Sequence, residues 1–103
     1  MAARLTIYYT SDTHGYLFPT NYADGQVRQM GLLCAAKRMN KGENALLLDG
    51  GDTIQGSPLA RYCHAGGVKS PVARVMRAMG YDYITLGNHD FNYGMAYLDS
   101  YLN

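Results

Sequence analysis

The stretch Tyr83-Ile84-Thr85-Leu86-Gly87-Asn88-His89-Asp90 joins a run of strand-forming residues to a cluster of polar side chains. β-branched and aromatic residues in its first half predict a strand over about 82–86. Its second half combines a flexible turn with an amide oxygen, an imidazole and a carboxylate. Because open α/β sheets place their chemistry at the carboxyl ends of strands, we expect this cluster at the tip of a buried strand.

Two other segments of the chain have the same form. Residues 4–10 alternate apolar and polar side chains, which predicts a strand that ends before Asp12-Thr13-His14. Residues 44–49 contain the consecutive apolar run Ala45-Leu46-Leu47-Leu48, which favours a parallel strand covered on both faces, and the turn Gly50-Gly51-Asp52 follows. Each of the three predicted strands is therefore followed by a glycine-bearing cluster of potential ligands.

Helical patterns separate these strands and follow the last one. The predicted helices cover about 29–40, 57–64, 70–79 and 93–102, and a long loop covers 16–26. Ser57 and Ser70 each precede a proline and are predicted to cap their helices. Strands that alternate with helices predict an α/β fold with a parallel sheet and right-handed crossovers.

Composition limits the classes of function. The chain has 103 residues, 48% of them apolar and 17% charged, which are values for one small globular domain. A net charge of +1 without basic runs argues against a nucleic-acid partner. No apolar run reaches about 18 residues, so no membrane partner is expected, and the polar opening predicts a cytoplasmic protein. Cys34 and Cys63 lack metal-type spacing and are expected to be buried or inert thiols.

The polar clusters offer a mixed set of metal ligands. Carboxylate, imidazole and amide oxygens together suit Mn²⁺, Fe²⁺ or Zn²⁺, and Asp52 could use both oxygens to bridge two ions. Simpler interpretations stay open for each residue. Asn88 would also suit a left-handed turn after Gly87. His89 and Asp90 could form a solvated pair, and His64 falls inside a predicted helix, where a surface position is expected.

Taken together, Asp12-Thr13-His14, Gly51-Asp52 and Gly87-Asn88-His89-Asp90 resemble the first half of the calcineurin-like metallophosphoesterase signature. Residues 51–58 and 87–94 are similar to the 5′-nucleotidase and 2′,3′-cyclic-nucleotide phosphodiesterase branch. The resemblance implies a partial metallophosphoesterase sandwich with its metal site at the carboxyl ends of the strands. It further implies that 1–103 is the N-terminal part of that domain, without the domain's C-terminal half and without a nucleotide-binding domain.

The resemblance implies four metal ligands and two catalytic residues for two divalent ions. The ligands would be Asp12 and His14 for the first ion, Asp52 as the bridge, and Asn88 for the second ion. His89 would hydrogen-bond the phosphoryl group and help the leaving oxygen depart, and Asp90 would orient and polarise His89. The family's remaining ligands, a lone histidine and a Gly-His-x-His motif, would follow Asn103.

The implied activity is hydrolysis of nucleotide phosphomonoesters or cyclic phosphodiesters by metal-bound hydroxide, with a small-molecule nucleotide or phosphoester as substrate. The alternative is a catalytically inactive fragment or a non-enzymatic binding module with an incomplete metal site. In that case we expect weak metal binding at most. Apolar sheet surface left uncovered would favour self-association.

Overall fold

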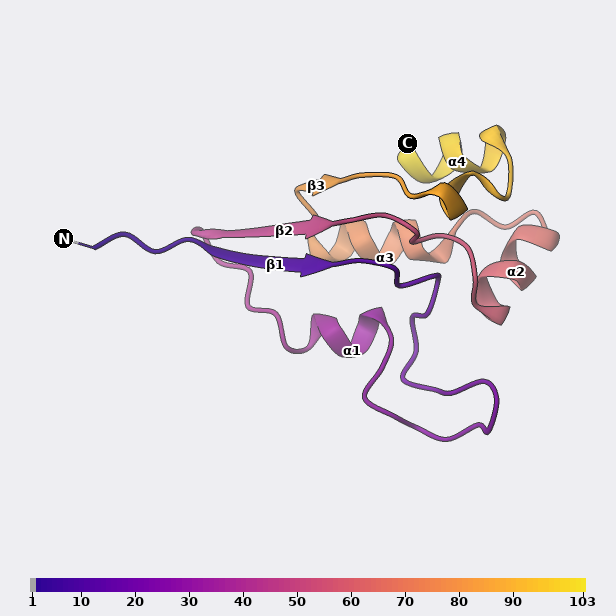
Figure 1. Ribbon diagram of the computed structural model, residues 1–103, viewed down its shortest axis with the longest axis horizontal. Helices are drawn as coiled ribbons and strands as arrows, with labels where there is room; N and C mark the ends of the chain where they lie inside the picture. The colour runs from indigo at the N-terminus through magenta and orange to yellow at the C-terminus, as the bar shows by residue number, and fades with distance from the viewer. Residues whose placement is uncertain (1) are drawn as a thin grey trace.

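The computed structural model describes residues 2–103 as a three-stranded parallel sheet with short helices (Figure 1). The strands are β1 (Thr6–Thr10), β2 (Ala45–Asp49) and β3 (Tyr83–Ile84), in that order across the sheet. β1 and β2 pair in parallel along their whole length, and β3 pairs in parallel with the end of β2. The predicted α/β class and the three parallel strands are confirmed.

Within residues 2–103, four α-helices and one 3₁₀ turn connect the strands or follow β3. These are α1 (Leu32–Ala36), α2 (Pro58–Ala65), α3 (Pro71–Met79), η1 (Asn88–Phe91) and α4 (Met95–Leu102). As predicted, the segment 16–26 contains neither a helix nor a strand of the sheet. Among the described residues, no helix is long and apolar enough to cross a membrane.

All three strands are shorter than the sequence predicts, because pairing decides their ends. β1 starts at Thr6, where its pairing with Ala45 of β2 begins, so β2 also starts one residue later than expected. β3 covers two residues of the predicted 82–86, since only Tyr83 and Ile84 find partners before β2 ends at Asp49. Local propensity therefore located the strands but did not set their lengths.

The first predicted helix is also shorter than 29–40. Gly31 has a φ of 85° and forms the N-cap of α1, and a Cβ on it would lie 2.6 Å from the carbonyl oxygen of Leu17. This close approach fixes a glycine there and delays the start of the helix. Gly94, with a φ of 90°, likewise starts α4 at Met95 instead of residue 93.

The prediction that a serine caps the helix is right for α2 and wrong for α3. The hydroxyl of Ser57 accepts a hydrogen bond from the amide of Ala60 at 3.0 Å and so caps α2. Ser70 makes no such bond, although Pro71 does begin α3. At the other end of α3, Gly80 adopts a left-handed φ of 80° and its N–H reaches Met76 and Arg77 carbonyls, as a C-cap glycine does.

The apolar residues of β2 are covered on one face only. Leu47 is 1% exposed, whereas Leu46 and Leu48 are half-buried, so the prediction of cover on both faces is wrong. By strand register, Leu46 lies beside Ile7, and Leu48 lies beside Tyr9 and Tyr83. We call these five residues the open face.

Exposure is high on the open face, with Ile7 at 56%, Tyr9 at 64% and Tyr83 at 70%. The third strand is therefore not the buried strand that the sequence predicted. Leu47 lies on the other face of β2, where it lines a hollow with residues of α1 and α3. In residues 2–103 no helix shields the open face to the same extent.

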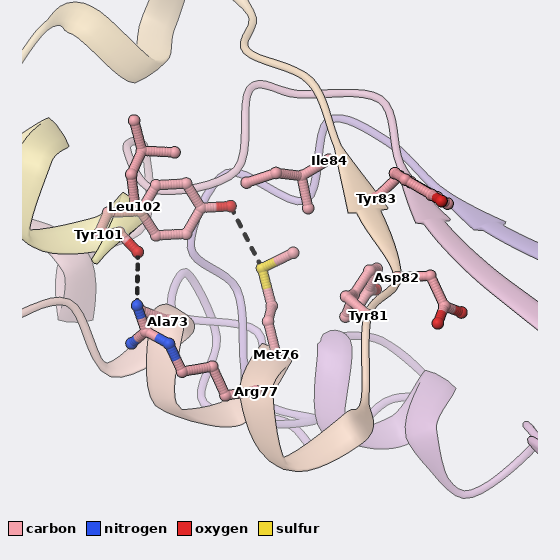
Figure 2. A pocket seen from close by; sticks show the side chains of 9 residues that line it. All are labelled: Ala73, Met76, Arg77, Tyr81, Asp82, Tyr83, Ile84, Tyr101 and Leu102. Carbon is pink, nitrogen blue, oxygen red and sulfur yellow. Dashed lines mark hydrogen bonds between the residues drawn. The ribbon is translucent and has the colours of Figure 1, made fainter.

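The hydrophobic core connects α3 and α4 with the loops at the strand ends. Its buried members are Leu17, Leu32, Ile54, Val72, Ala73, Met76, Leu98 and Tyr101. The hydroxyl of Tyr101 donates to the sulfur of Met76 at 3.4 Å, and Arg77 donates to the Tyr101 carbonyl at 3.0 Å. Figure 2 shows these contacts beside a cavity of about 170 Å³ between α3, β3 and α4, which none of the predicted site residues lines.

Candidate metal centre

The loops after the three strands meet at one edge of the sheet (Figure 1). The amide of Asp12, after β1, donates to the carbonyl of Gly51 at 2.9 Å, and the amide of His14 donates to the carbonyl of Asp52 at 3.0 Å. After β3, the amide of His89 donates to the Asp52 carboxylate at 2.8 Å. Hydrogen bonds donated by backbone amides thus join the three clusters, as parallel strands with aligned ends allow.

Three predicted ligands lie close enough to share an ion. One ligand atom each from Asp12, His14 and Asp52 lies within 4.8 Å of the other two. Nε2 of His14 lies 4.0 Å from a carboxylate oxygen of Asp12. Two carboxylates and one imidazole suit borderline or hard divalent ions, so the chemistry of the donors fits the metal that the sequence predicts.

The orientation of His14 also fits a metal ligand. Its Nδ1 lies 2.8 Å from the carbonyl oxygen of Gln55. Because a carbonyl oxygen only accepts, Nδ1 carries a proton, and in the neutral ring the free lone pair is that of Nε2, on the side of Asp12. Ligating histidines commonly use such a second hydrogen bond to fix the ring and its tautomer.

The same three residues carry the backbone strain of the molecule. Asp12, His14 and Asp52 have φ values of 55°, 49° and 55°, and they are the only non-glycine residues of the described chain with a positive φ. Such conformations cost about 1–3 kcal/mol each and persist only where the surroundings enforce them. All three are predicted ligands, and residues in such conformations cluster at functional sites.

Asn88 and His89 begin the 3₁₀ turn η1. Asn88 is exposed and does not adopt a positive φ, so the alternative of a left-handed turn residue is wrong. The ring of His89 lies edge-on to the ring of His14, with their centres 5.5 Å apart. The imidazole predicted to face the phosphoryl group therefore lies beside a predicted metal ligand.

Asp90 does not contact the ring of His89. It is 1% exposed, which excludes a solvated pair, and its carboxylate oxygens accept hydrogen bonds from backbone amides on the loops of Asp52 and Gly87. Nδ1 of His89 lies instead 3.2 Å from the amide nitrogen of Asn92. The predicted orientation of His89 by Asp90 is thus not supported by the contacts, because packing directs this carboxylate into the protein.

Two residues at the site, Gln55 and Asn92, were not predicted from the sequence. Gln55 acts through its backbone carbonyl, for which no side-chain signal exists. Asn92 lies three residues after His89, a spacing that brings side chains together on a helical turn, so prediction of η1 would have drawn attention to it. His64, as predicted, lies in α2, and its ring stacks on Tyr93 with centres 4.1 Å apart.

Comparison with known proteins places this geometry in a family. The calcineurin-like phosphoesterase family matches residues 5–103. A 2′,3′-cyclic-nucleotide 2′-phosphodiesterase/3′-nucleotidase from Haemophilus influenzae is 39% identical over 91% of this chain and 16% of its own length. A 5′-nucleotidase from Diplobatis ommata is 34% identical over 96% of this chain and 18% of its own length.

A solved structure agrees with the sequence matches. The crystal structure of a calcineurin-like phosphoesterase from Bacillus subtilis superposes with a TM-score of 0.77 and 35% identity, over 94% of this chain and 33% of that one. The chain thus spans less than a fifth of the length of the two curated relatives. Because the match covers nearly every residue here, from the first strand to the last helix, this chain belongs to the calcineurin-like phosphoesterase family.

Proposed function

We propose that the chain forms part of a dinuclear metal-dependent phosphoesterase that hydrolyses nucleotide phosphomonoesters or cyclic phosphodiesters. The observation that carries the proposal is the convergence of Asp12, His14 and Asp52 within 4.8 Å at one edge of the sheet. The names of the relatives, a cyclic-nucleotide phosphodiesterase and a 5′-nucleotidase, support the choice of substrate class.

In this proposal Asp12 and His14 would hold the first ion, Asp52 would contribute to both ions, and Asn88 would contribute to the second. Divalent ions bound there would supply Lewis acidity toward a phosphate and a nearby water molecule. The protein's own contribution is to keep the donors in place: Gln55 fixes the His14 ring, and the His89 amide holds Asp52.

His89 is proposed to bind the phosphoryl group and assist the leaving oxygen. The amide nitrogen of Asn92 only donates, so Nδ1 of His89 accepts and the ring proton lies on Nε2. A neutral imidazole with a proton on Nε2 can donate a hydrogen bond to a phosphate oxygen. The ring of His89 lies beside that of His14, a proposed ligand of the first ion.

The test uses a complete domain, since this chain spans a small part of its relatives. Residues 5–103 replace the matching segment of the Bacillus subtilis phosphoesterase, and hydrolysis of bis(p-nitrophenyl) phosphate and of a 2′,3′-cyclic nucleotide is measured with Mn²⁺. We expect His89→Ala to lower kcat at least about 100-fold, and Asp52→Asn to abolish turnover. Asp24→Asn, at an exposed carboxylate paired with Arg28, is the control. Unchanged turnover in Asp52→Asn and His89→Ala would refute the assignment.

A second candidate is that the chain by itself is a non-catalytic module. Within residues 2–103 there is one group of three or more histidine, cysteine or acidic side chains with converging ligand atoms. Three such donors are fewer than two ions require, since even one zinc ion takes about four ligands. We therefore expect weak Mn²⁺ binding by the isolated chain in titration calorimetry. Tight binding of two ions would exclude this candidate.

Self-association is the other property we propose for the isolated chain. Its open face presents Ile7, Tyr9 and Tyr83 to solvent, together with the half-buried leucines of β2. Contiguous exposed apolar surface of this kind is typical of protein interfaces and of aggregation-prone chains. A second copy of the chain would remove it from water.

A further inference from the structure

The carboxylate of Asp90 is saturated with hydrogen bonds. One oxygen accepts from the amides of Thr53 and Ile54 at 2.7 and 3.1 Å, and the other accepts from the amides of Asp52 and Gly87 at 2.8 and 2.9 Å. A carboxylate offers about four lone-pair positions, so none remains for an imidazole or a metal ion. Asp90 therefore has no lone pair left for a metal ion or a substrate, and its role must be exerted through the backbone amides that it binds.

Three of the four bound amides belong to the loop that carries the proposed bridging ligand. Those of Asp52, Thr53 and Ile54 are consecutive, and their convergence on one anion is the arrangement called a nest. A nest requires a left-handed residue in the run, and Asp52 has a φ of 55°. The Asp90 carboxylate thus stabilises the strained conformation of Asp52.

The contact between the two loops is reciprocal. Asp90, after β3, binds the amide of Asp52, and the Asp52 carboxylate in turn accepts from the amide of His89 at 2.8 Å. The glycines allow this closeness, since a Cβ on Gly51 would lie 2.5 Å from the amide nitrogen of Gly87. Each loop therefore fixes the other.

We propose that Asp90 is a positioning residue of the metal centre, whose buried carboxylate locks the Asp52 loop in the left-handed conformation that brings Asp52 toward Asp12 and His14. The centre is then preformed by the protein before any ion binds. The proposal rests on the proposed metal centre for its purpose, but the lock itself is a property of the metal-free chain. Its physical test therefore needs no metal.

The first measurement is amide hydrogen exchange of the metal-free 103-residue chain, read residue by residue by NMR. In the native chain the amides of Asp52, Thr53 and Ile54 should be protected. In Asp90→Asn, which replaces one acceptor oxygen by an NH₂ donor, they should exchange at least about tenfold faster relative to the amides of α3. Unprotected amides in the native chain would refute the lock even if the variant failed to fold.

Asp82→Asn is the matched control. The Asp82 carboxylate also binds a backbone amide, that of Leu47 at 2.9 Å, but it lies at the amino end of β3, away from the site. Its removal should speed exchange at Leu47 and leave the amides of 52–54 unchanged. If Asp90→Asn speeds exchange uniformly across the chain, Asp90 is merely a stability residue and the proposal is wrong.

The second measurement is Mn²⁺ affinity, followed through the electron paramagnetic resonance signal of the free ion. Loss of a group that orients a ligand typically weakens metal binding about 10- to 100-fold, so we expect a loss of that size in Asp90→Asn and none in Asp82→Asn. Equal affinities of Asp90→Asn and the native chain would refute the positioning role. If the native chain binds no Mn²⁺, the proposed metal centre of the isolated chain fails, and hydrogen exchange alone decides the lock.

Discussion

Gly87→Ala should open the contact between the loops of Asp52 and His89. Gly87 has a φ of −92°, so alanine meets no conformational strain there. Its Cβ, however, would lie 2.1 Å from a carboxylate oxygen of Asp52 and 2.7 Å from the Asp52 amide nitrogen, well inside an ordinary contact of about 3.5 Å. The backbone of the loop would have to move. We expect a cost of about 1–3 kcal/mol, the usual range for overpacking.

Two other glycines separate this clash from other effects of alanine. Gly94→Ala meets no atom within 4 Å but must adopt a φ of 90° and a ψ of 166°, a region almost restricted to glycine, so it should cost about 1–3 kcal/mol through backbone strain alone. Gly42→Ala meets neither clash nor positive φ, and it should stabilise the chain slightly, by under about 1 kcal/mol. Gly87→Ala thus introduces a steric clash, Gly94→Ala introduces backbone strain, and Gly42→Ala introduces neither.

The assay combines thermal unfolding, followed by circular dichroism, with Mn²⁺ titration. A loss of 1 kcal/mol lowers the melting temperature of a domain of this size by about 4–8 °C. Gly87→Ala and Gly94→Ala should both have lower melting temperatures than Gly42→Ala, but only Gly87→Ala should also bind Mn²⁺ more weakly. The reasoning is refuted if Gly87→Ala matches Gly42→Ala in both measurements.

Three further outcomes are expected from residues outside the site. The Leu47 amide and the Lys41 ammonium lower the pKa of Asp82 below its usual 3.8, so this carboxylate stabilises the fold above that pH and loses its effect as the pH falls. In Asp82→Asn, the free energy of unfolding in urea should therefore decrease less steeply as the pH is lowered into the acid range. An unchanged pH dependence would contradict this. Leu47→Ala, at 1% exposure, should lower the free energy of unfolding by about 2–5 kcal/mol in the same urea assay. Tyr9→Lys on the open face should lower the sedimentation-average mass of the chain at high concentration, whereas an equal mass would exclude association through this face.

The strand-end clusters show how far sequence reasoning reached at the site. Asp12, His14 and Asp52 were placed together from the rule that parallel strands end at one edge, and the structure brings them within 4.8 Å. The start of α2 was predictable too, because Ser57 and Pro58 act within a single turn. These signals are local, or they depend only on strand order.

The partner of each polar group was decided by tertiary packing. Asp90 binds the amide of Thr53, 37 residues away, and Nδ1 of His14 binds the carbonyl of Gln55, 41 residues away. Neither contact follows from residue types, because any backbone amide or carbonyl could have been the partner. The sequence predicts Asp90 as the partner of His89, whereas in the tertiary structure its buried carboxylate accepts hydrogen bonds from backbone amides of the neighbouring loop.

The sequence by itself determined the α/β class, the three parallel strands and the convergence of Asp12, His14 and Asp52, since these depend on hydrophobic periodicity and on glycine-bearing turns. Tertiary structure decided the lengths of β3 and α1, the open face and the left-handed backbone of Asp12, His14 and Asp52. The physical reason is the sequence distance over which the interactions act. Hydrophobic periodicity depends on neighbouring residues, whereas strand ends, close glycine contacts and strained backbone conformations arise only when distant segments pack together.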